Sequence, residues 1–292
     1  MKIILFSRRQ ISHNAEELQQ IFDAIHLFGF EYAVNEEFAP IVEASVGIEI
    51  PPQNRYADRV DGEPDSSIMV CYGGDGTLLE GVHRLHGAAI PLIGINSGHL
   101  GFLTSAPTAG ISQIFNDIFS DNIKLEARSM LEVGGDFTTI PDSVLALNEF
   151  SIQRHGAGMI SVETYVDRQM VATYHGDGVL VCTPTGSTAY SLSVGGPVVA
   201  PQCACLVISP LAPHNLTMRP VVVPDSSKIT MRIRARHTDP FISLDNRIYC
   251  VKDGSVFTVK RAENKIFLAV PHNISFYDTL RDKMMWGVDI RS

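Results

Sequence analysis

The sequence predicts two domains and a returning helix. We expect an α/β domain with an open parallel sheet in residues 1-122, an all-β, sandwich-like domain in residues 123-272, and a terminal helix in residues 273-292 that returns to the first domain. The chain has 292 residues with 45% hydrophobic content, and one core usually serves no more than roughly 250 residues. Strands alternate with amphipathic helices before residue 123, whereas strand-like runs follow one another after it.

The first strand and helix are predicted by the N-terminal pattern. Residues 2–6 form an apolar run that is typical of a strand. Asn14 can cap a helix, and Glu17 stands three residues later, as in a capping box. The helix after this cap carries one apolar stripe, made of Leu18, Ile21, Phe22, Ile25 and Phe28.

Residues 30–34 predict a second strand, and a helix containing Phe38, Ile41 and Val42 is expected after it. Residues 51–65 are polar, contain three prolines and show no hydrophobic period. We interpret them as a mobile loop.

The most informative stretch begins with a short buried strand over residues 68–71 and continues as Gly73-Gly74-Asp75-Gly76-Thr77. Apolar residues at helical spacing follow, namely Leu78, Val82 and Leu85. A glycine turn between a strand and a helix aims backbone N–H groups and a positive helix end at an anion. The stretch therefore predicts a phosphate site.

Asp75 is unusual inside such a turn, because a carboxylate repels phosphate unless it has a chemical role. It could accept a proton from an attacking hydroxyl, or hold a metal ion that rides on the phosphates. The alternative is an ordinary strand–helix turn with an exposed aspartate. The buried strand before three glycines favours phosphate chemistry.

A further strand over residues 90–95 ends in a second glycine-rich turn over residues 96–103. The next helical stripe is Ile111, Ile114, Phe115, Ile118 and Phe119. Open parallel sheets with helices on both faces bind ligands at the carboxyl ends of their strands, where both turns are expected.

The second half of the chain reads as short strands. Asp167-Arg168-Gln169 is typical of a hairpin turn, and Phe276, Leu280 and Met284 share one face of the terminal helix. The expected strands cover residues 144–153, 159–166, 170–174, 178–182, 205–208, 228–234, 255–260 and 265–270.

Two polar segments stand out in this half. Residues 176–193 combine glycines and hydroxyl residues around Tyr190, whose ring could pack on a base or ribose; the alternative is an ordinary Ser/Thr-rich loop. Asn148-Glu149 interrupts an apolar strand, and buried polar residues need partners. An amide beside a carboxylate suits a pair of ribose hydroxyls, and the alternative is an edge strand with both side chains in water.

Together these segments resemble the NAD kinase family, in the family's order and at similar separations. The turn at Asp75 is also similar to turns in diacylglycerol kinases, sphingosine kinases and phosphofructokinases, whereas residues 183–190 are much more specific. The resemblance implies transfer of a phosphoryl group from ATP to the 2′-hydroxyl of the adenosine ribose of NAD, with a divalent metal such as Mg²⁺. It also implies a homodimer or homotetramer.

The same resemblance implies residue roles. Asp75 is the proton acceptor, Asn148 and Glu149 hold ribose hydroxyls and adenine, and Asp177 approaches the nicotinamide end. Phe102 lies near the adenine. The other expected nucleotide-binding residues are Gly73, Gly74, Gly76 and Thr77 at the phosphates, and His175, Thr185, Thr188, Ala189, Tyr190, Ser191, Leu192, Ser193 and Arg247 around the dinucleotide.

Two positions depart from the commonest family pattern. His175 stands where many members carry arginine, and Asp245-Asn246-Arg247 stands where Asp-Gly-Gln is frequent. Asn246 can take the left-handed conformation of glycine, and Arg247 could bind a phosphate.

Composition and missing motifs exclude other classes. A net charge of −9 with scattered basic residues argues against a nucleic-acid partner. The sequence has no apolar run of about 18 residues, so we expect no membrane span. Five cysteines, mostly in apolar runs, fit reduced, buried thiols in a cytoplasmic protein. Cys203-Ala204-Cys205 has no second pair with metal-site spacing.

The sequence has neither a Gly-x4-Gly-Lys-Ser/Thr turn nor a Gly-x-Gly-x-x-Gly turn after the first strand. A P-loop nucleotidase and a dehydrogenase are therefore disfavoured. A lipid or sugar kinase and a non-enzymatic dinucleotide-binding regulator remain as alternatives. Polyphosphate remains open as the donor, and NADH as the acceptor.

Overall fold

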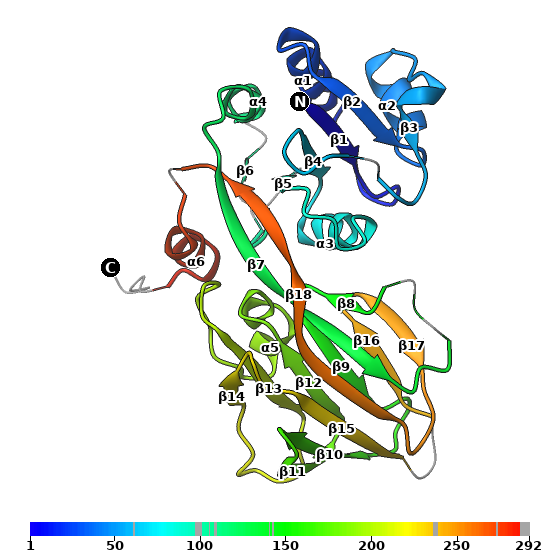
Figure 1. Ribbon diagram of the computed structural model, residues 1–292, viewed down its shortest axis with the longest axis vertical. Coiled ribbons are helices and arrows are strands. Elements are labelled where there is room, and N and C mark those ends of the chain that lie inside the picture. The colour runs from blue at the N-terminus through cyan, green and yellow to red at the C-terminus, as the bar shows by residue number, and fades with distance from the viewer. Residues whose placement is uncertain are drawn as a thin grey trace. The chain divides into compact units, whose positions relative to one another are not determined.

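The computed structural model describes residues 1–60, 62–96, 101–104, 106–107, 110–139, 141, 143–235, 239–272 and 274–286. The chain forms two compact units (Figure 1). Unit 1 comprises Met1–Ala127 and Ile266–Ser292, and unit 2 comprises Arg128–Lys265.

Unit 1 is built on a parallel sheet. In spatial order its strands are β3 (Arg55–Tyr56), β2 (Glu31–Asn35), β1 (Lys2–Phe6), β4 (Ser67–Tyr72) and β5 (Leu92–Asn96), and β6 (Ala106–Pro107) also pairs with β5. The end of β18 (Val256–Val270) adds a parallel pair beside β5, where Leu268 faces Leu92. The carboxyl ends of these strands therefore meet at one edge, as predicted.

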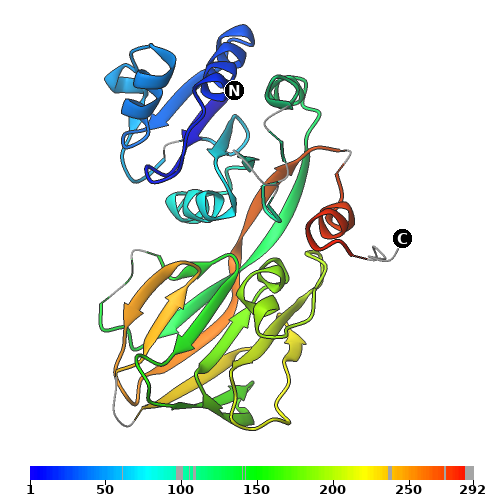
Figure 2. The ribbon, with the colours of Figure 1, turned by 180° about the vertical axis from the view of Figure 1, so that it is seen from behind.

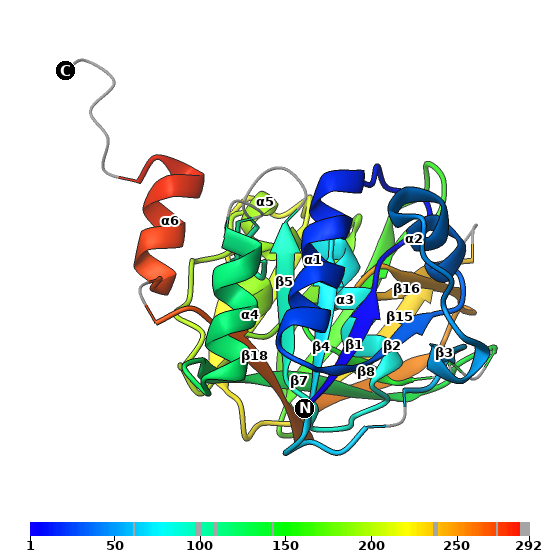
Figure 3. The same cartoon turned by 90° about the horizontal axis from the view of Figure 1, so that it is seen from above.

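Helices cover both faces of this sheet. One core cluster joins alternate strand residues such as Ile3 and Val70 to three helices, namely α1 (Ala15–Leu27), α2 (Ala39–Val46) and α4 (Ile111–Phe119). Figure 3 looks onto the face that carries α1 and α4. The helix α3 (Asp75–Arg84) packs on the opposite residues: a Cβ on Gly81 would lie 2.5 Å from the Cys71 sulfur.

Two local predictions in unit 1 are wrong. The expected loop at 51–65 contains a short 3₁₀ helix, η1 (Pro52–Asn54), and strand β3, which pairs with β2. Glu17 does not complete a capping box. The Asn14 side chain caps α1 by accepting from the Glu16 amide, and the Glu17 carboxylate instead accepts the Tyr72 hydroxyl.

Unit 2 consists of two β-sheets that share one apolar core (Figure 2). One sheet contains β11 (Gln169–Gly176), β10 (Ile160–Val166), β15 (Ile229–Ala235) and β18, with β7 (Lys124–Gly135) beside β18 and the short β8 (Leu145–Ala146) beside β7. The other contains, in order, β14 (Val221–Pro224), β13 (Cys205–Leu211), β12 (Gly178–Cys182), β9 (Glu149–Gln153), β16 (Phe241–Leu244) and β17 (Arg247–Cys250), all antiparallel. The predicted sandwich-like domain is confirmed.

Two strand predictions in the second half need correction. Residues 255–260 and 265–270 belong to one strand of 15 residues, β18. The expected strand over 144–153 is interrupted at Leu147-Asn148, and its two parts, β8 and β9, join different sheets. The hairpin prediction is confirmed, because Asp167 and Arg168 connect β10 to β11 with φ angles of 49° and 69°.

The terminal helix α6 (Phe276–Met284) begins with a capping box between Ser275 and Asp278. All five cysteines lie in the described ranges and are free, but Cys203 and Cys250 are exposed and Cys205 is half-buried, so the expectation of buried thiols is correct only for Cys71 and Cys182. Among the described helices, none has the length and hydropathy needed to cross a membrane.

Tyr72 offers a test of how the loop after β1 is fixed. Its buried hydroxyl donates to Glu17 and accepts from the Asn14 amide at 3.2 Å. We expect Tyr72→Phe to lower the free energy of unfolding by about 1–3 kcal/mol, because both polar partners lose a bond. Tyr32→Phe is the control, since that ring packs on Phe22 in the same unit. Equal urea midpoints for both variants would contradict this prediction.

Candidate active site

The glycine turn after β4 is shaped by close packing. Gly73 has a φ of +146°, and a Cβ there would lie 2.4 Å from the Thr77 hydroxyl oxygen and 2.9 Å from Ile11. Gly74 occupies the N-cap of α3, and a Cβ on it would meet no described atom within 4 Å. The turn is therefore tight on one side and leaves open space beside the helix N-terminus, where an anion can approach.

The Asp75 carboxylate accepts four hydrogen bonds from residues 102–104, at the end of the second glycine turn. Oδ1 accepts from the Leu103 amide at 3.1 Å, the Thr104 amide at 3.0 Å and the Thr104 hydroxyl at 3.0 Å. Oδ2 accepts only from the Phe102 amide, at 2.8 Å. Because a carboxylate oxygen has two lone pairs, Oδ2 retains acceptor capacity while Oδ1 does not.

Gly101 is required by this arrangement. A Cβ at that position would lie 1.7 Å from Asp75 Oδ1 and 2.4 Å from the Thr104 hydroxyl oxygen. The two glycine turns predicted from sequence therefore meet at one carboxylate. The middle of the second turn, residues 97–100, lies outside the described residues.

Asn148 and Glu149 lie where the chain passes from one sheet of unit 2 to the other. The buried carboxylate of Asp245 accepts the amides of Leu147, Asn148 and Glu149 at 2.9, 2.7 and 3.1 Å. The Asp245 amide donates back to the Glu149 carbonyl at 2.9 Å. Three consecutive amides turned toward one carboxylate cannot take part in a regular strand ladder, which explains the break in the predicted strand.

Three buried polar atoms in this region lack a partner among the described residues. They are Asn148 Oδ1, Glu149 Oε2 and Thr185 Oγ1. Asn148 and Glu149 are 6% and 9% exposed, and β9 lies between β12 and β16, so the alternative of an edge strand in water is wrong. An unpaired buried polar group costs about 1–3 kcal/mol, so these three atoms have hydrogen-bonding capacity that a polar ligand could use.

Glu149 is a neutral acid in this environment. Burial, and next the nearby Asp245 carboxylate, raise the pKa of Glu149 to about 8, although the Tyr190 backbone amide acts in the opposite direction. Burial also raises the pKa of Asp245, but its three amide donors favour the ionised form. Near neutral pH, Glu149 therefore carries a proton that it can donate to a ligand.

The hydroxyl-rich segment after β12 divides into structural and open positions. Thr183 donates to the Leu147 carbonyl at 2.6 Å and accepts from the Gly186 amide at 3.1 Å. A Cβ on Gly186 would lie 2.1 Å from the Asn148 carbonyl oxygen. These contacts hold η3 (Thr185–Thr188) against the break at Asn148.

Most other residues of this segment have hydrogen-bond partners within the protein. Ser187 and Val199 exchange two hydrogen bonds, and buried Ser191 pairs with Ser209. Thr188 and Ser193 donate to backbone carbonyls within the segment, Ala189 caps the one-turn helix α5 (Tyr190–Ser193), and Leu192 is half-buried. Tyr190 remains 38% exposed, so its ring is accessible to a ligand.

Asp177 has a partner that the sequence pattern did not reveal. Arg154 holds both of its carboxylate oxygens, with Nε at 2.5 Å and Nη2 at 3.4 Å, and the Arg154 amide donates to the Asp177 carbonyl. Burial, followed by the charges of Asp177 and Glu149, raises the pKa of Tyr190, so both carboxyl groups act on this phenol. No local signal pointed to Arg154, because it is 23 residues from Asp177.

The two departures from the family pattern have structural roles. His175 Nδ1 lies 2.8 Å from the Ser161 hydroxyl on the neighbouring strand β10. Arg247 donates to the Ser143 and Leu145 carbonyls at 2.8 and 2.5 Å, so two of its nitrogens hold the chain around β8. The left-handed residue of the β16–β17 turn is Asp245, with φ +51°, and not Asn246 as expected, because this conformation serves a carboxylate that reaches back to 147–149.

Comparison with known proteins identifies relatives over nearly the whole chain. The family model of the ATP-NAD kinase N-terminal domain matches residues 12–123, and that of the C-terminal domain matches residues 147–270. A Cytophaga hutchinsonii NAD kinase is 39% identical over 265 residues, which are 90% of each chain. A Bacteroides fragilis NAD kinase is 32% identical over the whole of both chains.

The chain belongs to the NAD kinase family. Its fold is also that of solved structures. A yeast NADH kinase complexed with NADH superposes with a TM-score of 0.85 at 21% identity, covering 100% of this chain and 89% of that one. An Archaeoglobus fulgidus NAD kinase in complex with ATP gives a TM-score of 0.75 at 25% identity, covering 98% and 99%. The predictions of family, fold class and kinase activity are confirmed.

A divalent metal held by the protein itself would need several ligand side chains close together. Within the described ranges, no group of three His, Cys, Asp or Glu side chains could hold an ion. In the first glycine turn, the Asp75 carboxylate offers only Oδ2, which accepts one hydrogen bond, because Oδ1 already accepts three. The described side chains therefore do not form a metal site by themselves.

Gly101→Ala tests the junction of the two glycine turns. The added methyl group would displace the Asp75 carboxylate, so we expect the rate of phosphoryl transfer to fall at least about 100-fold. Gly110→Ala is the matched control, because a Cβ there meets no described atom within 4 Å. Steady-state rates and melting temperatures would be measured for both variants, and equal rates would contradict the role of the junction.

Glu149→Gln tests the buried acid. Its pKa rises from 4.5 unfolded to about 8 folded, so between these values the folded protein binds a proton that the unfolded chain releases. The free energy of unfolding of the parent should therefore fall as pH rises through this window, by up to about 1.4 kcal/mol per pH unit.

Glu149→Gln should flatten that dependence, while Glu263→Gln, at an exposed position of β18, should leave it unchanged. Urea unfolding at several pH values measures the slopes. A slope that survives in Glu149→Gln would assign the pH dependence to another group.

Proposed function

We propose that this chain transfers the γ-phosphoryl group of ATP to the 2′-hydroxyl of the adenosine ribose of NAD, giving NADP and ADP. The observation that carries the proposal is the set of three buried, unpaired polar atoms on Asn148, Glu149 and Thr185. They lie in the unit that also presents the exposed ring of Tyr190. A sugar with paired hydroxyls satisfies such atoms, and an acyl chain does not.

The dinucleotide is held by complementary hydrogen bonds. Asn148 Oδ1 accepts from a ribose hydroxyl, and protonated Glu149 donates to an oxygen or a ring nitrogen of the adenosine. Thr185 adds a hydroxyl, and Tyr190 packs on the ligand. Asp177, which Arg154 fixes, approaches the nicotinamide end in this proposal. Neutral Glu149 avoids adding a second negative charge beside Asp245.

The phosphates bind at the N-terminus of α3, where Gly74 leaves open space and the helix end is positive. Asp75 is the proton acceptor, and Oδ2 is the oxygen with remaining capacity. The ribose 2′-oxygen forms a bond to the γ-phosphorus while the bond from that phosphorus to the bridging oxygen breaks, so ADP leaves. The hydroxyl proton passes to Oδ2 and then to solvent.

A bound Mg²⁺ would neutralise phosphate charge during transfer, and it would be held by the nucleotide phosphates and water because the described residues form no metal-ligand cluster. We also propose a cytoplasmic location, since all five cysteines are free. A homodimer or homotetramer is proposed from the family resemblance.

A product assay with an Asp75 variant tests the proposal. Parent protein with Mg²⁺ and ATP should convert NAD to NADP, and a lipid or a sugar in place of NAD should give no product. Asp75→Asn should lower turnover about 10²–10⁴-fold, because a general base is lost. Its amide NH₂ would also face a backbone N–H, so a lower melting temperature is expected.

Asp282→Asn, on the exposed face of α6, is the matched control and should keep the parent rate. Near-parent turnover in Asp75→Asn would remove the assigned role of Asp75. Failure of the parent to form NADP, with lipid or sugar phosphorylated instead, would overturn the proposed function.

A further inference from the structure

The loop that follows β1 lies against the phosphate turn. β1 and β4 are parallel neighbours, and the Ser7 hydroxyl donates to the Tyr72 carbonyl at 2.6 Å, one residue before the turn. Ile11 from the same loop lies close to Gly73, because its Cδ1 atom would be 2.9 Å from a Cβ on that glycine. The loop after β1 therefore packs directly against the glycine turn.

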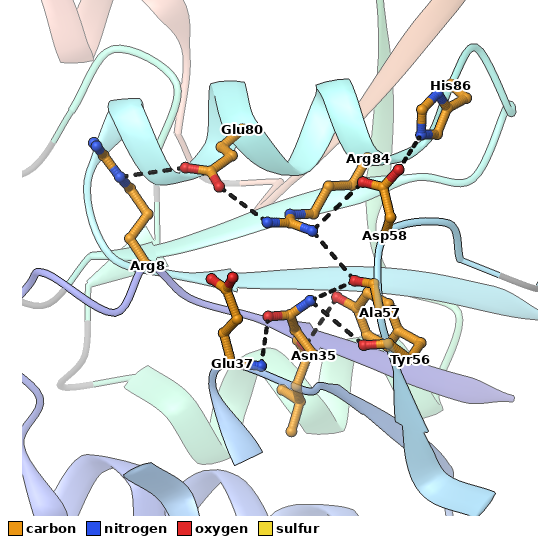
Figure 4. Close-up of polar contacts among 10 residues, drawn as sticks. Arg8, Asn35, Glu37, Tyr56, Ala57, Asp58, Glu80, Arg84 and His86 are labelled. Atoms are coloured by element: carbon orange, nitrogen blue, oxygen red, sulfur yellow. Dashed lines mark hydrogen bonds and ion pairs between the residues drawn. The ribbon is translucent and has the colours of Figure 1, made fainter. Parts of the chain in front are cut away.

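Arg8 reaches from this loop to the start of α3. Its Nη1 atom lies 3.2 Å from the position of a Cβ on Gly76. Its Nε atom forms an ion pair with Glu80 at 3.3 Å, one helical turn further along α3. Figure 4 shows the terminal nitrogens of Arg8 on the side of the guanidinium away from Glu80.

A chain of charged contacts along α3 fixes this orientation (Figure 4). Glu80 also pairs with Arg84 at 3.2 Å, and Arg84 contacts Asp58 at 3.7 Å and the Ala57 carbonyl at 3.2 Å. The Arg84 side chain is only 15% exposed, and its guanidinium lies over the Phe6 ring. Arg84 therefore holds Glu80 in place, and Glu80 contacts Arg8 through the Nε atom of Arg8.

The two terminal nitrogens of Arg8 remain available. Within the described ranges, no hydrogen bond or ion pair is formed by Nη1 or Nη2, and the side chain is 37% exposed. Two carboxylates near the start of α3 are already engaged, since Glu80 pairs with two arginines and Asp75 accepts four hydrogen bonds. A planar guanidinium with two free nitrogens matches two oxygens of a phosphate group.

We propose that Arg8 binds a phosphate group of a nucleotide substrate at the N-terminus of α3, with Glu80 as its positioning residue. This inference rests on the proposed function, because it names a further residue of the same site. The ligand chemistry is a phosphate oxygen pair, which either the triphosphate of ATP or the diphosphate of NAD can supply. Arg8 then adds a full positive charge to backbone N–H groups that carry only partial charge.

Binding experiments with Arg8→Gln test the proposal without turnover. Dissociation constants would be measured by calorimetry for ATP, ADP, AMP, adenosine and NAD. Arg9→Gln is the matched control, because it removes the same charge from the adjacent, exposed position. We expect Arg8→Gln to weaken the binding of ATP or NAD by about 10- to 100-fold and the binding of adenosine by less than about twofold. The control should stay within about threefold for every ligand.

The pattern of losses identifies the phosphate. A loss that grows from AMP to ATP assigns Arg8 to the donor, and a loss confined to NAD assigns it to the acceptor diphosphate. Either result supports the proposal. Equal losses for adenosine and ATP would show a purely structural role, and no loss for ATP or NAD would also overturn the proposal.

Salt dependence gives a second readout. The affinity of the parent for the assigned nucleotide should fall more steeply with ionic strength than that of Arg8→Gln, because one charge contact is missing in the variant. Equal salt slopes would contradict direct contact. If the protein binds ATP through Arg8 but forms no NADP, the proposed function fails while this inference stands.

Discussion

In each unit, one carboxylate that accepts several backbone amides organises the candidate functional residues. Asp75 accepts hydrogen bonds from the backbone amides of residues 102–104 in unit 1, and Asp245 accepts them from the amides of residues 147–149 in unit 2. In both cases the acceptor lies far along the chain from its donors. The loops around the site therefore take their shape from a few strong, charge-assisted bonds and not from a regular ladder.

These bonds decide which polar groups remain free. Because Asp245 draws the amides of 147–149 inward, the side chains of Asn148 and Glu149 come to lie at the break between sheets with unpaired atoms. Burying these unpaired atoms costs free energy, which the proposed ligand would recover on binding. Asp75 shows a similar division, because its Oδ1 is saturated with hydrogen bonds and its Oδ2 can still accept a proton.

Local features of the site could be predicted from the sequence. Helical stripes such as that of α1, and the glycine turn at Asp75, depend on residues a few positions apart, and their types and places were correct. The motif at 183–190 carried the family assignment, which the relatives confirm.

Features that depend on distant partners could not be predicted. The run at 144–153 looks like one strand, and the residue that breaks it, Asp245, lies about 100 positions later. Arg154 has no motif of its own, and its role depends on the register between β9 and β12, which brings Asp177 beside it. The capping box at Glu17 failed for the same reason, because a tyrosine from β4 supplied a competing donor.

The use of main-chain donors has a consequence for how the site tolerates sequence change. Any amino acid except proline supplies a backbone N–H. Residues 102–104 and 147–149 can therefore hold their carboxylates with many different side chains, provided that the path of the chain is kept. At these six positions the hydrogen bond itself forbids only proline, so other substitutions leave the hydrogen bonds to the two carboxylates intact.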